Sequence, residues 1–521
     1  DGIFILTVPS NATGLIFSLV GMATKELIIP SSNQITTTLT RNNKSLDEVI
    51  VVGYGQVKKG DFTGSANQVS SDDFKERGIM NPLNAIVATG PGVQTTAAGG
   101  SPGSSPGIRI RGFGSISASD GPLIVVDGIA YDGGLANLNP DDIETITTLK
   151  DAATVALWGS RASNGVIMIT TKRGARNRDN LSIKATQGYS SRGIPEYDRV
   201  NAFQYYPLMW EAMRNSLMYP TTGTGQTPDL AAQNATNGIK GQLAYNPFKG
   251  VAANAIVGTD GKLNPAASEL LYPDDLDWAQ ELMRPGVRNE YVLSYSGGNE
   301  KSDYLGSFGY VKEKGYLIRS DWQRFTGRLV VNTQPQKWIK TGLNVSASVN
   351  KSNQASDGSS TGYVNPFFFS RGIGPLYPIH AHNMTTGEYL LDEFGNKIFD
   401  LGNMSGLGLG IPNRPSGAYP GRHVIDETLL NQNDFRRNTI SGRTYGRIYF
   451  TKWLYFTTNF GTDITDYNSS TCENTIVGDG APAGRASKAN QKTISYTINQ
   501  VLNFNKRFNE HNVGFTSGHE N

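Results

Sequence analysis

Two histidines separated by one residue, His380 and His382, are the side chains whose type and spacing most suggest chemistry. In an extended segment both point to the same face, and two imidazoles on one face can bind a metal ion. No cysteine or suitably spaced carboxylate completes such a site. The sequence therefore favours a polar histidine pair in a loop and predicts no metal ion there.

Three neighbouring carboxylates, Asp141, Asp142 and Glu144, offer a second possibility, because paired carboxyl groups can act as general acid and base. Aspartates also cap the starts of helices. We expect this simpler role here, with both aspartates solvated. Neither a P-loop nor an H-E-x-x-H motif occurs, and the sequence predicts no catalytic residue.

The segment Gly53-Tyr54-Gly55 follows an apolar run, Val49 to Val52, and so resembles the start of a dinucleotide-binding loop. A third glycine is absent. The residues that follow, from Gln56 to Asp61, begin a helix poorly, so no helix dipole would meet a phosphate. The sequence predicts no nucleotide cofactor, and an oxidoreductase would rest on this motif alone.

The composition excludes several classes of protein. Lys plus Arg number 47 and Asp plus Glu number 45, so no strong field attracts nucleic acid. No run of about 18 apolar residues predicts a membrane-spanning helix. The single cysteine, Cys472, excludes an internal disulfide framework. Glycine is abundant, at 60 of 521 residues, and only 18% of residues are charged, as is typical of a glycine-rich β protein.

Long alternating segments follow residue 180. In residues 338–350, for example, Leu343 and Val345 fall on one face and Asn344 and Asn350 on the other. Soluble sandwiches use strands of about 5–6 residues, whereas a tilted bilayer crossing needs about 9–11. We expect nine strands: 181–189, 288–297, 302–312, 322–333, 337–350, 438–451, 453–467, 491–504 and 509–517.

The connections between these segments alternate between short and long. Outer-membrane barrels have short periplasmic turns and long outer loops, so the asymmetry favours a barrel. Residues 202–217 are expected to form a helix in an early outer loop. The long loop 351–437 is rich in aromatic residues that could bind a ligand or a partner: Tyr363, Phe367, Phe368, Phe369, Tyr377 and Tyr389.

Three segments carry a resemblance to a known family. They are LDEVIVVGYG at 46–55, IRIRGFGS with PLIVVDG at 108–128, and KDAATVALWGSRASNGVIMITTKRG at 150–174. They resemble the SusC/RagA group of TonB-dependent outer-membrane transporters of Bacteroidetes. The resemblance implies a mainly β fold, in which an α+β plug fills an antiparallel transmembrane barrel of about 22 strands. Because nine strands cannot close such a barrel, we expect the sequence to be a fragment that lacks its start and the rest of the barrel.

The resemblance also implies a division of the chain. Residues 1–45 correspond to the end of a carboxypeptidase-regulatory-like β-sandwich extension, and 46–60 to the TonB box and linker. Residues 61–178 correspond to the plug, and 179–521 to the first part of the barrel. The implied partners are TonB, a SusD-like surface lipoprotein, the lipid bilayer of the outer membrane, and an oligosaccharide or peptide substrate.

Two groups of residues are candidates for function. The first is the extended apolar run at the TonB box, which can add a strand to a partner sheet: Asp47, Glu48, Val49, Ile50, Val51 and Val52. A buried plug strand is the alternative for this run. The second group is the plug signature, whose charged members we expect to hold the plug against the barrel wall: Arg109, Arg111, Gly112, Asp127, Gly128, Lys150, Asp151, Gly159, Arg161 and Gly165.

The sequence thus predicts energised import through a plugged barrel, with no enzyme activity and no cofactor. The alternative from another class is a soluble exported β-rich adhesin or ligand-binding module. Such a protein would stay soluble without detergent, and both faces of its strands would be buried or polar.

Overall fold

Strands dominate the computed structural model of the chain, with 43% of residues in strands and 19% in helices. The structure describes residues 6, 14–17, 25–29, 35, 37–38, 49–52, 55–58, 65–87, 91–96, 101–112, 114, 120–151, 155–355, 365–509 and 511–521. No helix in these ranges is long and apolar enough to cross a bilayer.

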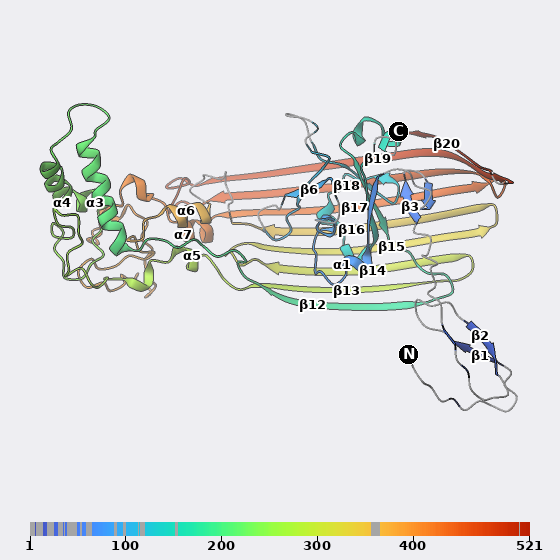
Figure 1. The fold of residues 1–521 in the computed structure, drawn as a ribbon, viewed down its shortest axis with the longest axis horizontal. Helices are drawn as coiled ribbons and strands as arrows, with labels where there is room; N and C mark the ends of the chain where they lie inside the picture. The colour runs from blue at the N-terminus through green and yellow to red at the C-terminus, as the bar shows by residue number, and fades with distance from the viewer. Residues whose placement is uncertain are drawn as a thin grey trace.

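The largest element is an antiparallel sheet, here called the wall, in which nine described strands pair in chain order. Every strand expected after residue 180 is present, and each is as long as or longer than expected. Figure 1 shows the strands running side by side along the long axis of the molecule. Their bounds are β12 (Asn180–Ser190), β13 (Gly286–Gly298), β14 (Ser302–Lys314), β15 (Asp321–Gln336), β16 (Ile339–Asn353), β17 (Gln432–Tyr449), β18 (Leu454–Glu473), β19 (Arg485–Phe508) and β20 (His511–Glu520).

The wall is open in the described residues, because β12 and β20 each pair with a strand on one side only. Its strands alternate between two environments. In β15, Arg324 and Arg328 face the plug and are buried, whereas Phe325 and Leu329 face away, with Leu329 52% exposed. Leu343 of β16 continues the exposed apolar face. Such a face is stable against lipid, because exposure of this much apolar surface to water is unfavourable.

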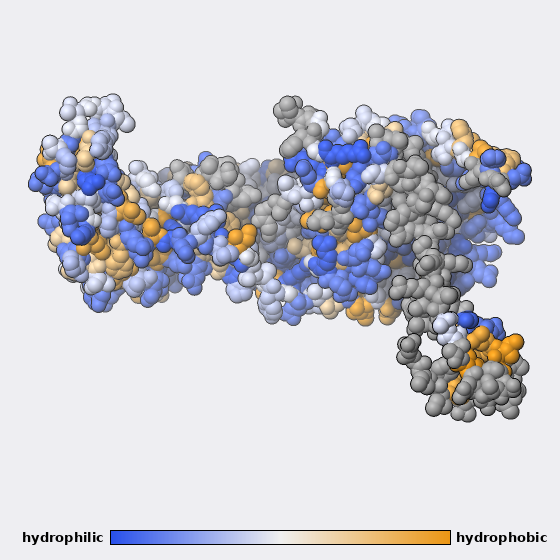
Figure 2. Space-filling view, in the orientation of Figure 1, coloured by the Kyte–Doolittle hydropathy of each residue, from blue (hydrophilic) through white to orange (hydrophobic). Residues whose placement is uncertain are grey.

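The space-filling view shows the same apolar surface from one side. Hydrophobic residues gather along the lower edge of the sheet, over β12, where Leu181 and Ile183 are exposed (Figure 2). A soluble sandwich would bury such residues, so this surface contradicts the alternative of a soluble adhesin.

The plug is built on a five-stranded mixed sheet with strand order β5-β10-β11-β8-β9. Only β8 and β11 pair in parallel; the other neighbours are antiparallel. Apolar side chains cover both faces, with Ile146 and Ile167 on one and Leu149 and Met168 on the other. The strands are β5 (Ala66–Ser70), β8 (Leu123–Val126), β9 (Ile129–Ala130), β10 (Ile143–Leu149) and β11 (Val166–Thr171).

Short helices accompany this sheet, and the remaining strands form separate two-stranded sheets, of which β1 with β2 lies apart from the plug (Figure 1). The helices are α1 (Ser71–Phe74), η2 (Pro82–Ala85), η3 (Leu135–Asn137), η4 (Pro140–Asp142) and η5 (Ala156–Ala162). The paired strands are β1 (Gly14–Phe17) with β2 (Lys25–Ile28), β3 (Val49–Val52) with β4 (Gly55–Lys58), and β6 (Val93–Thr96) with β7 (Gly107–Ile110).

The glycines of the plug signature have a conformational role. Gly112, Gly128, Gly159 and Gly165 all adopt positive φ, which other L-residues rarely do. At Gly165 a side chain would also lie 2.8 Å from Ile110. The signature therefore requires glycine at this position for both backbone and packing.

The long outer connections fold together into one lobe at the far end of the wall (Figure 1). Its core contains Trp210, Tyr245, Trp278, Phe369 and Tyr377. The helix expected over 202–217 is present as α3, and α4 was not expected. The helices are α3 (Ala202–Met218), α4 (Pro228–Leu243), η6 (Pro273–Asp275), α5 (Trp278–Glu281), α6 (Pro366–Gly372), η7 (Met404–Leu407), η8 (Ser416–Ala418) and α7 (Val424–Leu430).

The lobe corrects one expectation from the sequence. Phe369 and Tyr377 were expected to be available to a ligand or partner, but both are fully buried in the lobe core. A long loop that folds independently must bury aromatic side chains for stability, and these two serve that purpose. Tyr363 lies outside the described residues.

Candidate functional site

The contact between plug and wall is polar, and Arg324 of β15 is its centre. Arg324 is only 2% exposed. Its Nη1 atom donates to the carbonyl oxygens of Met80, Ala136 and Leu138, at 3.0, 2.8 and 3.0 Å. These carbonyls belong to two separate plug segments, so a single guanidinium holds both against the wall.

A second wall arginine, Arg328, lies four residues further along β15, on the same face of the strand. It donates to the carbonyl oxygens of Asp142, at 3.3 Å, and of Lys172, at 3.0 Å, and to the Thr171 hydroxyl. Its Nε atom also donates to Asn344 of β16, at 3.1 Å. The contact therefore fixes the guanidinium from both plug and wall.

Asp142 corrects a second expectation, because its side chain is buried rather than solvated. It does lie at a helix start, where Asn139 Oδ1 accepts from the Asp141 amide. Burial raises the pKa of Asp142, and the nearby Arg328 opposes that rise. Asp141 instead reaches the wall, where Lys184 Nζ lies 2.9 Å from its Oδ1 atom.

Asparagines of the wall complete the contact. Asn344 Nδ2 donates to Asp127 Oδ2 at 2.8 Å. Asn350 Nδ2 donates to Asn137 Oδ1 at 2.5 Å, and Asn137 donates in turn to Thr439 Oγ1 at 3.0 Å. Polar groups of this kind can exchange their partners for water when water enters, so such a contact seals the plug and still permits its release.

The plug signature residues divide between two roles in the structure. Asp127 and Arg161 reach the wall, Arg161 through Glu520 of β20 at 3.0 Å. Arg109 and Lys150 bond within the plug instead, to Asp120 and to the Pro91 carbonyl. Arg111 adopts positive φ and is exposed, while Asp151 is half-buried beside β10.

Arg324 and Arg328 were not among the residues that we expected to hold the plug, although the sequence contains a pattern that points to them. Both fall on the polar face of a strand whose opposite face is apolar, and two arginines four residues apart on that face are costly unless something pairs with them. The charged side chains that we expected to form the plug–wall contact were those of the plug itself. The partners of the arginines are backbone carbonyls, which sequence patterns do not distinguish.

The apolar run at the TonB box is extended, as expected. Val49–Val52 form β3 and pair with β4 in a two-stranded sheet, separate from the plug sheet. The other edge of β3 has no strand partner in the described part of the chain. Asp47 and Glu48 lie outside the described residues.

The histidine pair lies in the lobe and clamps one carboxylate. His380 Nδ1 and His382 Nε2 lie 2.7 and 2.9 Å from the two oxygens of Asp275. Burial acts to raise the pKa of Asp275, but hydrogen bonds from both histidines outweigh it and lower the pKa. His380 Nδ1 and His382 Nε2 are therefore bound to the Asp275 carboxylate and are not available to coordinate a metal ion. Among the described residues, no three His, Cys, Asp or Glu side chains are arranged to hold a metal ion.

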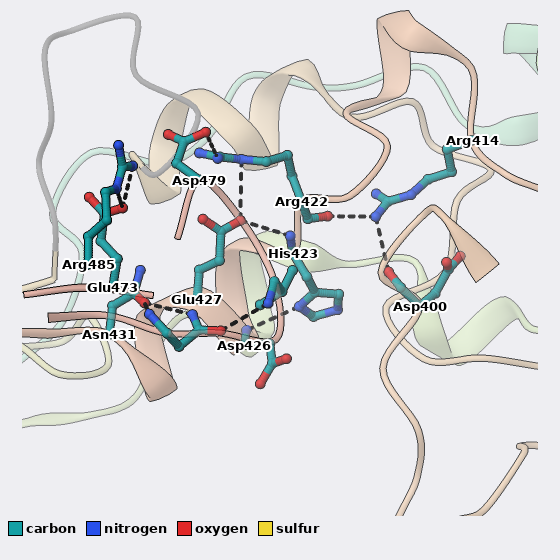
Figure 3. A network of polar contacts seen from close by, with 12 residues as sticks. Asp400, Arg414, Arg422, His423, Asp426, Glu427, Asn431, Glu473, Asp479 and Arg485 are labelled. Carbon is teal, nitrogen blue, oxygen red and sulfur yellow. Dashed lines mark hydrogen bonds and ion pairs between the residues drawn. The ribbon is translucent and has the colours of Figure 1, made fainter. Parts of the chain in front are cut away.

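A buried polar network joins the loops of the lobe (Figure 3). Arg414 donates to the carbonyl oxygens of Asp400 and Arg422, at 3.0 and 2.6 Å. Arg422 pairs with Glu427, at 3.4 Å, and with Asp479 of the following loop. The network therefore ties two loops into one body.

His423 in this network makes the lobe sensitive to pH. Its Nδ1 accepts from the Asp426 amide at 3.1 Å, and its Nε2 lies 2.8 Å from the Ile379 carbonyl oxygen. Burial lowers the pKa of His423 to about 3 from 6.5. Because the unfolded chain binds this proton and the folded lobe does not, lobe stability falls as the pH drops below 6.5. Burial raises the pKa of Asp426 to about 6, so proton uptake there opposes the fall.

We therefore expect the Asp426→Asn variant to lose lobe stability more steeply than the parent on acidification. Between pH 7 and pH 5 the loss from His423 is on the order of 2 kcal/mol. Amide hydrogen exchange of α7 at both pH values measures it. If parent and variant lost the same amount of lobe stability between pH 7 and pH 5, the opposing role of Asp426 would be contradicted.

Comparisons with known proteins agree with this architecture. Residues 58–166 match the family model of the TonB-dependent Receptor Plug Domain. The chain is 29% identical over 442 residues to the TonB-dependent receptor SusC of Bacteroides thetaiotaomicron, a match that covers 81% of this chain and 37% of SusC. It is 26% identical over 528 residues to the TonB-dependent receptor P3 of Formosa agariphila, covering 100% of this chain and 44% of that receptor.

A solved structure shows the same fold. The RagAB peptide importer in its open-open state superimposes with a TM-score of 0.63 at 22% identity, over 91% of this chain and 48% of the matched chain. The chain thus spans less than half the length of these relatives.

A plug packed through polar contacts on a long-stranded wall with an apolar outer face defines a TonB-dependent receptor. Within that class the chain is similar to the SusC/RagA-like receptors. Its place is the bacterial outer membrane, and its relatives are receptors and transporters rather than enzymes.

Proposed function

We propose that the protein imports a nutrient, an oligosaccharide or a peptide, across the outer membrane, with TonB supplying the force that displaces the plug. The observation that carries this proposal is the polar plug–wall contact centred on Arg324 and Arg328. An apolar contact of similar size would resist removal, because separating it exposes hydrophobic surface to water. Hydrogen bonds to carbonyls and amides can be replaced by water one at a time.

The free edge of β3 supports the role of TonB. A strand edge offers a row of backbone N–H and C=O groups to an incoming strand. Pulling on such a pairing loads many hydrogen bonds together, so an extended backbone matters more than the side chains. The TonB box assigned to Asp47–Val52 is part of this proposal, as is the plug boundary at residues 61–178.

The lobe supports a surface partner. It rises at the end of the wall that carries the long loops, which is the outer side of the membrane in proteins of this class. The folded loops provide a rigid surface for a SusD-like lipoprotein. The name of one relative favours a peptide as substrate, because the matched RagAB structure is described as a peptide importer.

Val51→Pro tests the proposal. Proline removes the N–H of a strand residue and cannot complete a ladder of hydrogen bonds. In cells that express the receptor from its native gene, we expect uptake of the nutrient to fall to the level of a strain lacking TonB, while the amount of receptor in the outer membrane stays unchanged. Val51→Ala keeps the N–H and should retain most uptake. Full uptake by the proline variant would contradict strand pairing at this segment.

A further inference from the structure

A cluster of cations lies on the outward face of the wall, away from the plug. It lines a cavity of about 780 Å³ across β14 to β19. The cations are Lys312, Lys314, Lys351, Arg436 and Lys488. All five are exposed. The proposed import route runs along the opposite, inward face, so it does not use them.

The strand register arranges the central cations in one row. Lys312 pairs with Gln323, Gln323 with Lys351, and Lys351 with Arg436. Arg436 in turn pairs with Asn468 of β18. Neighbouring strands lie about 4.8 Å apart, so these side chains form a continuous polar band around the outside of the wall.

On β17 to β19 the next row toward the opposite end of the strands is polar, with Asn438, Asp466 and Lys492. On β14 to β16 that row is apolar and aromatic. It contains Tyr310, Phe325 and Val349 in register, and Phe308 and Ala347 follow in the row beyond. Rows two residues apart are separated by about 7 Å along the strand. On β14 to β16 this change from cationic to aromatic within one row marks the boundary of the bilayer, with the cations at the level of the headgroups.

This boundary faces the outer leaflet. The cationic row lies near the ends of the strands that lead into the long connections, such as 354–431, whereas the opposite ends meet at short turns, such as 299–301. Long connections face outward in outer-membrane barrels.

The cavity has a surplus of positive charge. Its lining contains two carboxylates, Asp321 and Asp434, against the five cations. Asp321 is already paired with Arg284, at 2.8 Å, and Asp434 accepts from Gln432. Lys312, Lys314 and Lys351 have no acidic partner in the described part of the chain. The amides of Asn468 and Asn490 donate to Asp466, at 3.1 and 3.0 Å. The lysines and Arg436 are therefore the groups that suit phosphate oxygens.

We infer that this cavity binds the phosphate groups of a phosphorylated lipid in the outer leaflet. The lipid chains lie against the exposed residues of the apolar face, such as Phe325 and Leu329, while the headgroup fills the cationic cavity. A free anion would gain only the second contact. The site therefore anchors the receptor at a fixed depth and orientation in the membrane.

The test uses the receptor expressed from its native gene and reconstituted in nanodiscs. The probe is a diphosphorylated glycolipid, lipid A, mixed with its dephosphorylated form, and native mass spectrometry measures which lipid stays bound. The variant combines Lys312→Gln, Lys351→Gln and Arg436→Gln. A cation near an anionic lipid surface contributes about five-fold to binding, so the triple variant should retain the diphosphorylated lipid on the order of 100-fold less.

The matched control removes the same charge at the opposite end of the wall, through Lys301→Gln, Lys337→Gln and Lys452→Gln. All three residues are exposed and lie at the short turns. This control should retain the lipid as the parent does, and heat-modifiable gel migration confirms that both variants fold. Equal retention by the two triple variants would overturn the inference. Displacement of the lipid by inorganic phosphate alone would also overturn it, in favour of a general anion site.

Discussion

Replacing Arg324 with methionine is expected to open an ion leak through the receptor. The substitution keeps an unbranched side chain but removes the guanidinium, which leaves the carbonyl oxygens of Met80, Ala136 and Leu138 without their donor. Losing donors to buried carbonyls costs about 3 kcal/mol in total. A difference of that size raises the fraction of displaced plugs on the order of 100-fold. Conductance across a planar bilayer containing the receptor measures the leak.

Two controls sharpen this prediction. Arg324→Lys keeps a charge, but one ammonium cannot hold both plug segments as the planar guanidinium does, so an intermediate leak is expected. Arg436→Met removes an exposed arginine from the outward face of β17 and should leave the conductance unchanged. If the Arg324→Met variant showed the same conductance as the parent, other contacts would have to hold the plug.

Cross-linking the plug to the wall is expected to abolish import. Asp141 and Lys184 form a half-buried ion pair between plug and wall, at 2.9 Å, and cysteines at both positions can be joined by a short bifunctional thiol reagent. The single native thiol, Cys472, is first replaced by serine so that the reagent meets only the new pair. If the plug must move as a body, uptake should fall to background and recover when a cleavable linker is cut.

The matched control joins two positions of the wall. Glu473 and Arg485 form an exposed ion pair between β18 and β19, and a linker there leaves the plug free. This cross-linked receptor should import normally. Import that continues through the Asp141–Lys184 cross-link would mean that the substrate passes without displacement of this part of the plug.

Local pattern in the sequence was enough to predict the wall. Alternation has a period of two residues, and the pleat of a strand imposes that same period on its side chains. The inward position of Asn344 and Asn350 and the outward position of Leu343 and Val345 followed from it, and the structure agrees. Strand length then favoured a membrane wall, and the helix at Ala202–Met218 was also predicted from the sequence.

Tertiary structure decided which residues hold the plug. Asn137 meets Thr439 across 302 residues of sequence, and Arg328 meets Lys172 across 156. Such contacts depend on how two separately folded units pack, and no local pattern encodes that packing. The same holds for Asp275, which reaches His380 and His382 from more than 100 residues away.

The sequence by itself determined the class of this protein, because alternation, strand length and the plug motifs are properties of contiguous residues. It did not determine the plug–wall contact, since the partners of Arg324 are backbone carbonyls that every residue carries. Nor did it reveal that Phe369 and Tyr377 form a core, because their burial depends on loops that meet only after the wall has brought them together. Tertiary structure alone supplies that proximity.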